Sequence, residues 1–585
     1  MGRHEEDIRP RGRHFASKDA ASASTAAASA PAPEPVSDDD DMSSSDYAKA
    51  GRSASMMTGL ILVSRLTGFV RTWAMGAALG LSLLSSSYQI AYNLPSMLYE
   101  LVIGGMLITA FLPVYMEVRR ERGVEASNAY VGNLLGILLL VLGVVSLAAT
   151  IGAPAVIWTQ SFMSADTGEM GTAIYLFRFF AIEILFFGLG SVFSGVLNAH
   201  RDYFWSNFAP VLNNVVVIAS FAAFYALDEV IHVDQFVSVT VLAVGTTLGV
   251  FIQMACQIPA LKRHGVHPRL RVDFHDPALR KTLSLGVPTL AATVCVFVTA
   301  SVQNAAALAV QPETGASVIA YSRLWYTLPY ALLAVPLTTA LYTELSRDAL
   351  RGDRPAVRAG VARGMAQMCF YLIPFMFYLI VFSFPLNMIY CVGKFDVAGV
   401  EQVSEFLCFL APALPLYGIC MLLQKSCSAL MNMKPYALLV IAGAVAEVLV
   451  ALVGGVVLGG GMPVIAFSLA VSYFVTDAGG LLWLRRQLNG LAVRDMVRGI
   501  AFGLALGALG AAAGGGVLHV LEMAFGPIVT TVGGEPVGAP VVQTVAYVAI
   551  SGVVSLLVTF GGGALLRLPE AAMISSIAGR FTRRS

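Results

Sequence analysis

The sequence predicts an all-α protein that crosses a membrane many times. Of its 585 residues, 57% are hydrophobic and only 12% are charged, and the mean hydropathy is +0.73. Apolar runs of about 20 residues, the length that spans a bilayer as a helix, follow one another along most of the chain. Basic residues gather in alternate loops between these runs, as the positive-inside rule describes. These observations exclude a soluble domain and predict about fourteen transmembrane helices.

The chain begins with a segment that does not fit this pattern. Residues 1–50 are polar, rich in Ala, Ser and Pro, and include the acidic run 38–41. Such a composition cannot bury enough apolar surface to fold, and it lacks the apolar core of a cleavable signal peptide. We expect a disordered cytoplasmic tail here.

Hydropathy places the spans in order along the rest of the chain. The expected ranges are roughly 53–81, 84–115, 128–152, 172–199, 205–226, 236–261, 282–309, 317–345, 359–390, 400–431, 435–458, 463–484, 496–521 and 541–566. Segment 491–566 then holds two helices appended to the first twelve, and 567–585 is a basic cytoplasmic tail.

Loop charges orient these spans. Basic residues occupy the loops at 119–122, 200–201, 261–272, 346–358, 434 and 485–498, together with the C-terminal tail. The loops near 152–171, 227–235, 310–316, 459–462 and 522–540 contain no Lys or Arg, and Lys394 is the main exception on that side. This alternation predicts that both termini lie in the cytoplasm and that the number of spans is even.

Two short motifs recur at an offset of about 234 residues, which indicates an internal repeat. Tyr92-Asn-Leu-Pro95 returns as Tyr326-Thr-Leu-Pro329, and Leu-Asn198 with its following basic residue returns as Met-Asn432. An even repeat of six helices predicts two parallel lobes, at 51–270 and 271–490, related by an axis along the membrane normal. Pro95 and Pro329, inside matched spans, are expected to form hinges or to line a cavity, although proline also bends helices merely to fit their neighbours.

Arginines inside the spans are the candidate binding residues. A charge near mid-membrane costs roughly 2.5–3.5 kcal/mol, so such residues usually face protein or water. Arg65 lies about 18 Å along the first span, too deep to reach either interface comfortably. Arg71 lies about 120° around the same helix, and Arg323 lies in a later span. Planar guanidinium groups suit phosphate and pyrophosphate, although each could instead pair with a helix carbonyl or an intramembrane acid.

Other signals are weaker. Glu100, Arg178, Glu183, Glu447 and Asp477 are ionisable residues inside spans, and we expect them to form satisfied pairs rather than ion sites. No phosphate-binding loop, zinc motif or nucleophile elbow is present, so the sequence predicts neither an enzyme nor a cofactor. It indicates no nucleic-acid partner, and it leaves a metal site unknown.

The chain resembles the MurJ (MviN) family of lipid II flippases, in the multidrug/oligosaccharidyl-lipid/polysaccharide exporter superfamily. Similarity begins at Ser64-Arg65-Leu-Thr-Gly68-Phe69-Val-Arg71 and continues, in order, over about residues 53–490. The further matches are Leu94-Pro95, Leu197-Asn198, Phe208-Ala209-Pro210-Val-Leu212-Asn213, Tyr321-Ser-Arg323-Leu324 and Gly393-Lys394-Phe395. Segment 99–105, Tyr-Glu-Leu-Val-Ile-Gly-Gly, is similar to actinobacterial members.

This resemblance implies two six-helix lobes around a cationic cavity in a bacterial cytoplasmic membrane. The implied activity is export of undecaprenyl-pyrophosphate-linked peptidoglycan precursor, lipid II, by alternating access, with Arg65, Arg71 and Arg323 as cavity arginines. A coupling cation or the membrane potential would supply the energy. The alternatives are a cation-coupled multidrug exporter and a flippase for another lipid-linked polysaccharide. A membrane glycosyltransferase would need carboxylates at a membrane surface, and a non-transporting scaffold would leave the buried arginines unexplained.

Overall fold

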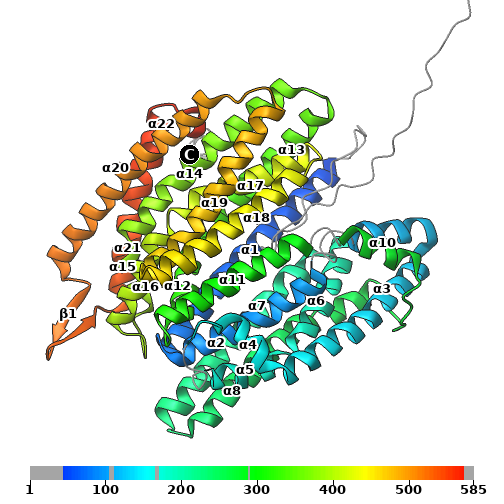
Figure 1. Ribbon diagram of the computed structural model, residues 1–585, viewed down its shortest axis with the longest axis horizontal. Helices are drawn as coiled ribbons and strands as arrows, with labels where there is room; N and C mark the ends of the chain where they lie inside the picture. The colour runs from blue at the N-terminus through cyan, green and yellow to red at the C-terminus, as the bar shows by residue number, and fades with distance from the viewer. Residues whose placement is uncertain (1–43, 105–110, 165–169, 287–289, 572–585) are drawn as a thin grey trace, which may run out of the picture.

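The structure is a computed structural model that describes residues 44–104, 111–164, 170–286 and 290–571 (Figure 1). Residues 1–43 of the predicted tail 1–50 and residues 572–585 of the predicted tail 567–585 lie outside the described residues. Residues 44–50, predicted to be disordered, belong instead to the first helix. The described chain is helical apart from short connections and one β-hairpin, as the composition predicts. Figure 1 shows the helices lying side by side in two groups, the earlier part of the chain in one and most of the later part in the other.

The first group contains the helices up to residue 263. They are α1 (Ser44–Leu79), α2 (Leu83–Tyr99), η1 (Glu100–Gly104), α3 (Leu112–Ile151), α4 (Ala153–Ser161), α5 (Gly171–Phe180), α6 (Glu183–Ala199), α7 (Tyr203–Tyr225), η3 (Ala226–Val230), α8 (Gln235–Ala255) and α9 (Ile258–Arg263). Packing pairs α1 with α7, α7 with α8, and α3 with α6, so this group forms one lobe, here called the N-lobe.

The second group follows a linker. The linker ends in α10 (Pro277–Gly286), which packs on α3 beside the N-lobe. The elements of the second group are α11 (Leu290–Val310), α12 (Gly315–Pro329), η5 (Tyr330–Ala334), α13 (Val335–Leu350), α14 (Arg354–Val381), α15 (Ser383–Asn387), η6 (Met388–Tyr390), α16 (Val397–Leu410), α17 (Ala413–Ala429), α18 (Lys434–Leu449), η7 (Val450–Val457) and α19 (Gly461–Gln487). Helices α14, α17, α18 and α19 pack on one another and form the centre of the C-lobe.

Two appended helices complete the fold on the outside of the C-lobe. They comprise α20 (Val493–Phe525), then α21 (Val541–Leu556) with η8 (Leu557–Gly561), α22 (Gly562–Leu565) and η9 (Pro569–Ala571). Helix α20 lies against α14 through glycines, because a Cβ at Gly499 would meet the Ala366 backbone at 2.5 Å and one at Gly507 would meet the Pro374 backbone at 2.8 Å. Between α20 and α21, β1 (Val529–Val532) and β2 (Glu535–Gly538) form an antiparallel hairpin that the hydropathy analysis treated as a plain loop.

The predicted spans match this helix order. Eleven helical segments of the described residues are long and apolar enough to cross a membrane, or twelve when α16 and α17, which meet at 44°, form one bent span. Helices α1 and α2, which carry the first two predicted spans, precede these segments. The fold class of an all-α polytopic membrane protein is therefore confirmed.

One predicted loop lies inside a continuous helix assignment. Helix α3 runs from Leu112 to Ile151, but Gly123 has φ 81° and ψ −175°, a backbone conformation open mainly to glycine. The second span therefore ends, and the third begins, at the basic segment 119–122, as the loop charges predicted.

Wide helical turns occur at matched places in the two lobes. In α2 the buried Pro95 precedes the π-helical segment η1, and in α12 Pro329 directly precedes the π-helical segment η5. Further π segments, η3 and η7, end the fifth span of one lobe and the fifth span of the other. Such segments are rare and mark local departures from the regular helix, so their recurrence supports the internal repeat.

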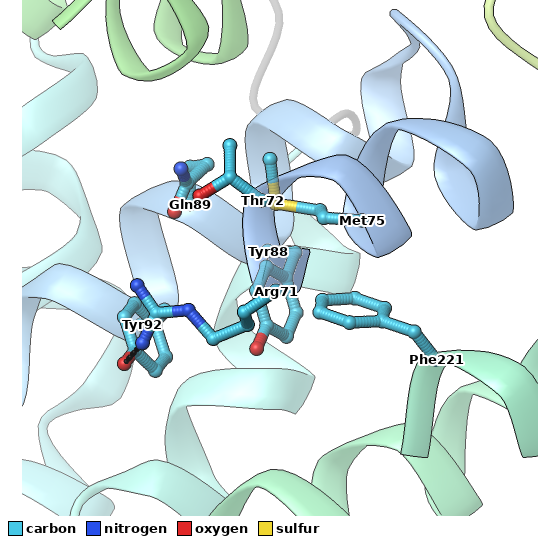
Figure 2. A pocket seen from close by; sticks show the side chains of 7 residues that line it. All are labelled: Arg71, Thr72, Met75, Tyr88, Gln89, Tyr92 and Phe221. Atoms are coloured by element: carbon cyan, nitrogen blue, oxygen red, sulfur yellow. Dashed lines mark hydrogen bonds between the residues drawn. The ribbon is translucent and has the colours of Figure 1, made fainter. Parts of the chain in front are cut away.

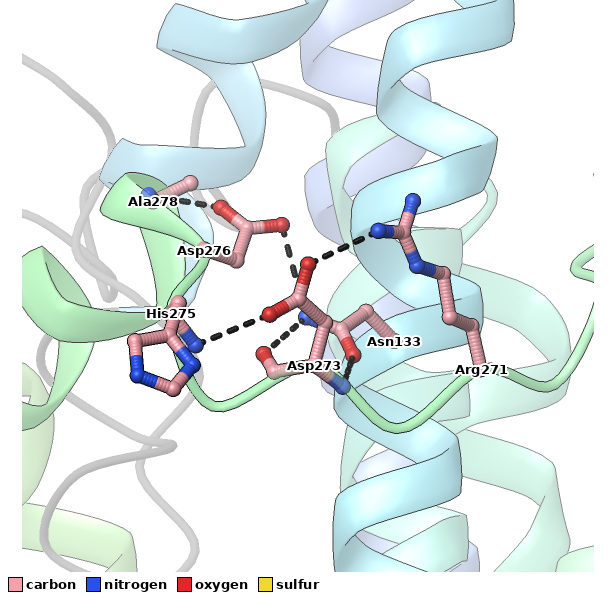
Figure 3. Close-up of polar contacts among 6 residues, drawn as sticks. All are labelled: Asn133, Arg271, Asp273, His275, Asp276 and Ala278. Atoms are coloured by element: carbon pink, nitrogen blue, oxygen red, sulfur yellow. Dashed lines mark hydrogen bonds and ion pairs between the residues drawn. The ribbon is translucent and has the colours of Figure 1, made fainter.

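The linker between the lobes is fastened to the N-lobe. In Figure 3 the side-chain amide of Asn133 donates to the Asp273 carbonyl at 2.9 Å and accepts from the Asp273 backbone N–H at 2.7 Å. Gly132 and Gly136 of α3 let the linker backbone approach, because a Cβ at either position would lie 2.1 Å from a linker carbonyl oxygen. The linker is thus held against α3 of the N-lobe.

Hydrogen bonds between the lobes gather at one end of the bundle, opposite the basic loops. Trp73 donates to the Ile389 carbonyl at 2.9 Å, and Tyr321 donates to the Gly80 carbonyl at 3.2 Å. Ser86 and Ser317 share a hydrogen bond of 3.1 Å. We call this end of the bundle, which also carries the hairpin, the outer end, and the other the basic end.

Candidate functional site

The three candidate arginines lie on α1 and α12, and the described residues show no contact between any two of them. Each has a different environment. Arg71 lies in an aromatic pocket of the N-lobe, and Arg323 lies among polar side chains of the C-lobe. Arg65, on α1, lies near tyrosines of the C-lobe.

Arg71 is positioned by tyrosines from α2. Its Nη1 donates to the Tyr92 hydroxyl at 2.5 Å, and its guanidinium carbon lies 5.1 Å from the centroid of that ring. Tyr88 stacks on Tyr92 at 5.6 Å and hydrogen-bonds Thr246 at 3.2 Å, so the ring that holds Arg71 is itself fixed. The arginine is therefore held by a neutral phenol rather than an acid, and its charge is not cancelled by this contact.

A small pocket, with room for about one water molecule, opens beside Arg71 (Figure 2). The residues that line it are Arg71, Thr72, Met75, Tyr88, Gln89, Tyr92 and Phe221. Figure 2 shows the arginine extended over the α2 tyrosines, with Phe221 of α7 closing the far side. One cation, several hydroxyls and an amide make this a polar pocket in an otherwise apolar helix packing.

Arg323 has partners within its own lobe. Its Nη2 donates to the Gln303 side-chain oxygen of α11 at 2.5 Å. Its charge also acts on the buried carboxyl of Glu447 in α18, which hydrogen-bonds Ser472. Arg323 thus agrees in part with the structural alternative that the sequence left open, in which an intramembrane arginine is balanced by an acid.

Arg65 differs from both. Its side chain is exposed, and within the described residues it forms no hydrogen bond or ion pair. It lies near enough to the phenols of Tyr330 and Tyr417, in η5 and α17 of the opposite lobe, for a weak electrostatic interaction. An arginine at membrane depth without a protein partner is expensive, so this side chain is the one best suited to meet a ligand or water.

The tyrosines near Arg65 form a cluster that the sequence analysis missed. Tyr417 lies at its centre, with ring centroids 4.2 Å from Tyr330, 5.1 Å from Tyr473 and 6.2 Å from Tyr326. These residues come from η5, α17, α19 and α12, so only the folded C-lobe brings them together. Tyr326 and Tyr330 are buried, and the Tyr326 hydroxyl donates to the Ala413 carbonyl, so only the half-buried Tyr417 and Tyr473 could offer a hydroxyl to phosphate or sugar oxygens.

The expectation of satisfied acidic pairs is wrong for two residues. Glu183 and Asp477 are buried, and none of their carboxyl oxygens has a hydrogen-bond partner in the described structure. Thr247 is a polar neighbour of Glu183, but its hydroxyl donates to the Phe179 carbonyl. Arg178 is exposed and forms no ion pair with a described residue, so it does not balance either acid. A buried carboxyl without donors is favoured in its neutral, protonated form.

Among the described residues, no three His, Cys, Asp or Glu side chains come close enough together to hold a metal ion.

The amide side chains of Gln303 and Asn304 connect helices. Asn304 donates to Gln160 of α4 at 2.9 Å, and Gln160 donates to Ser301 of α11 at 2.6 Å, so these amides join the lobes.

A family model described as "Lipid II flippase MurJ" matches residues 75–531. Arg323 falls inside this match, whereas Arg65 and Arg71 precede it. The lipid II flippase MurJ of Burkholderia cenocepacia is 29% identical over 374 residues, covering 63% of this chain and 70% of that protein. A probable lipid II flippase MurJ of Rhizobium tropici is 25% identical over 455 residues, covering 75% of this chain and 84% of that protein.

Solved structures share the fold. A lipid II flippase MurJ in an inward closed conformation has a TM-score of 0.67 at 18% identity, covering 87% of this chain and 99% of that one. An inward-facing multidrug resistance transporter of the MATE family has a TM-score of 0.63 at 13% identity, covering 74% of this chain and 98% of that one.

Proposed function

The chain belongs to the MurJ family of lipid II flippases, and from that membership we propose that it moves lipid II from the inner to the outer leaflet of a bacterial cytoplasmic membrane by alternating access. The observation in the molecule that best supports this activity is the exposed Arg65 of α1, which forms no hydrogen bond or ion pair with a described residue and lies near tyrosines of the C-lobe. A fixed cation there suits a substrate whose pyrophosphate must pass through the membrane while its polyprenyl tail stays in lipid.

The arginines would bind the pyrophosphate one after another rather than all at once. Arg65 is the proposed primary contact, because it has no described partner to release. Arg71 and Arg323 have single hydrogen bonds to a phenol and an amide, which leave other guanidinium N–H groups free to bind phosphate oxygens. Movement of the lobes would bring Arg323 toward α1, on which Arg65 and Arg71 keep a fixed separation.

The lobes would rock about the breaks in α2 and α12. Pro95 and Pro329 remove backbone hydrogen bonds, and a π segment that widens the helix begins five residues after Pro95 and directly after Pro329. The proposed role of these prolines is therefore that of hinges in the alternating motion.

We propose that the basic end faces the cytoplasm, because basic loops are retained on that side. A cysteine replacing the exposed Val532 of the hairpin should react with an impermeant thiol reagent in intact cells, and one replacing the exposed Asp353 should not. The unsubstituted protein, with its seven native cysteines, supplies the background signal. Labelling at residue 353 but not at residue 532 would reverse the proposed orientation.

Either a coupling cation or the membrane potential would drive the cycle. Glu447, next to Arg323, and the unpartnered Glu183 and Asp477 are the described groups that could exchange a proton or cation during it. A buried carboxyl changes its preferred protonation state when helix movement admits water, which links ion binding to conformation.

The multidrug exporter alternative rests on fold similarity alone. Such a transporter for cationic drugs would need an anionic cavity, whereas Arg65 places an exposed positive charge near the C-lobe tyrosines. A flippase for another lipid-linked polysaccharide would use the same pyrophosphate chemistry and would differ only in the sugar that it accepts.

Depletion of the protein in its own host tests the proposed function. Lipid II should accumulate in the inner leaflet, and the fraction accessible to an external lipid II-degrading enzyme should fall. Re-expression of the wild-type protein should restore that fraction. If outer-leaflet lipid II stayed normal in a strain without another flippase, the assignment to lipid II would be wrong.

A further inference from the structure

Lys394 breaks the charge pattern of the loops, and the structure shows what it contacts. It lies in the C-lobe connection between η6 and α16, at the outer end. Its Nζ is 2.6 Å from Asp228 Oδ2 and 2.7 Å from Glu229 Oε1, and 5.7 Å from the centroid of the Phe224 ring. All three partners belong to the end of α7 and to η3, so one C-lobe cation is held by a single segment of the N-lobe.

The backbone around Lys394 is built for close approach to α1. The Lys394 N–H donates to the Ala77 carbonyl at 3.0 Å. Gly393 has φ +63°, and a Cβ there would lie 2.2 Å from that same carbonyl oxygen. Gly80 has φ +65°, and a Cβ there would lie 2.4 Å from the Lys394 carbonyl oxygen. No side chain fits between these segments, so the register of the loop on α1 fixes where the lysine points.

The positive charge of Lys394 attracts the carboxylates of Asp228 and Glu229. Partial burial lowers the pKa of Lys394, but the hydrogen bonds and charges of Asp228 and Glu229 outweigh it and raise the pKa above its ordinary value. The lysine is therefore charged at neutral pH, and its side chain is only 31% exposed, so solvent screens the two ion pairs incompletely.

We propose that Lys394 is a positioning residue that latches the outer end of the lobe interface shut by binding Asp228 and Glu229. This inference rests on the proposed function, since a latch between lobes matters only if the lobes move. Release of a substrate at the outer end requires these lobe segments to separate, and the two ion pairs must then break. Partly exposed pairs are weak, so we expect them to shift the closed–open ratio by about five- to thirty-fold rather than to lock it.

Spin labels across the outer end would measure this ratio in the full-length protein. The labels replace the exposed Val237 of α8 and Ala398 of α16, in a background whose seven native cysteines are changed to alanine. Lys394→Glu places three carboxylates together and should increase the population at long distance by about five- to thirty-fold. The inverted variant, Lys394→Glu with Asp228→Lys and Glu229→Lys, should restore the short distance.

Two controls separate a latch from a general loss of structure. Glu535→Lys, on the exposed hairpin at the same end, makes the same charge change as Asp228→Lys without touching the cluster, and it should leave the distances unchanged. Raising the salt concentration should open the protein that retains Lys394 and have no effect on Lys394→Met, which keeps the side-chain length but not the charge.

An unchanged distance in Lys394→Glu, or an inverted variant as open as the single variant, would overturn the latch. Its failure is distinguishable from failure of the proposed function, because lipid II transport by the wild-type protein is measured separately. A salt-independent distance in the protein that retains Lys394 would also contradict it, and this arm involves no substitution in the cluster itself.

Discussion

Arg65→Ala is expected to abolish lipid II transport while leaving membrane abundance and thermal stability close to those of the wild-type protein. The exposed guanidinium has no described partner, so its removal strands no buried charge, and alanine is easier to insert than arginine by roughly 2.5–3.5 kcal/mol. If it binds pyrophosphate in bidentate fashion, two charge-assisted hydrogen bonds of about 1.5–3 kcal/mol each are lost. Transport should therefore fall by about a hundred-fold or more.

Arg178→Ala is the matched control for this variant. Arg178 is also an exposed arginine within a span, in α5, and it has no ion-pair partner among the described residues. Transport by Arg178→Ala should stay near the wild-type rate. Should Arg65→Ala lose expression in proportion to activity, the arginine would be structural, with a partner outside the described residues.

Substitution by lysine is the second large effect we expect. Arg65→Lys and Arg323→Lys keep the positive charge but replace a planar fork by a point charge, which cannot bind a phosphate through two parallel hydrogen bonds. The loss of one charge-assisted hydrogen bond should weaken lipid II binding by about ten- to hundred-fold. Native mass spectrometry of the purified proteins would compare lipid II with a zwitterionic lipid of similar tail, whose binding should change less.

Equal lipid II affinity and full activity in both lysine variants would mean that the site reads charge alone, or that it lies elsewhere. If only Arg65→Lys lost lipid II binding and transport, Arg323 would be a structural residue, held by Gln303 and balanced by Glu447. The lysine series therefore assigns a role to each arginine separately.

Much of the fold was predictable because the membrane imposes a simple pattern. Apolar runs and alternating loop charge gave the order of the spans, and even the turn hidden inside α3 at Gly123 was marked by the basic run at 119–122. The hairpin also carried a signal, since Gly533-Gly534 separates two β-branched or polar runs, as in a two-residue turn. That signal was overlooked because hydropathy analysis treats every polar segment as a loop.

The site was only partly predictable. Arg65, Arg71 and Arg323 stand out in sequence because charges are rare in spans, but nothing in the sequence shows that a phenol holds Arg71 and an amide holds Arg323. The tyrosine cluster around Tyr417 draws residues from four separate elements, so its formation depends on tertiary packing. Lys394 was visible as an exception, yet its partners follow only from how the lobes meet at the outer end.

Reconstitution tests the central claim most directly. Purified wild-type protein and Arg65→Ala would be placed in vesicles containing fluorescent lipid II, under an imposed membrane potential or cation gradient, and transfer between leaflets would be followed by quenching from outside. We predict rapid transfer with the wild-type protein, and transfer at the rate of protein-free vesicles with Arg65→Ala. Two results would contradict this account. One is wild-type transfer no faster than in protein-free vesicles under every gradient, and the other is equally fast transfer with the wild-type protein and with Arg65→Ala.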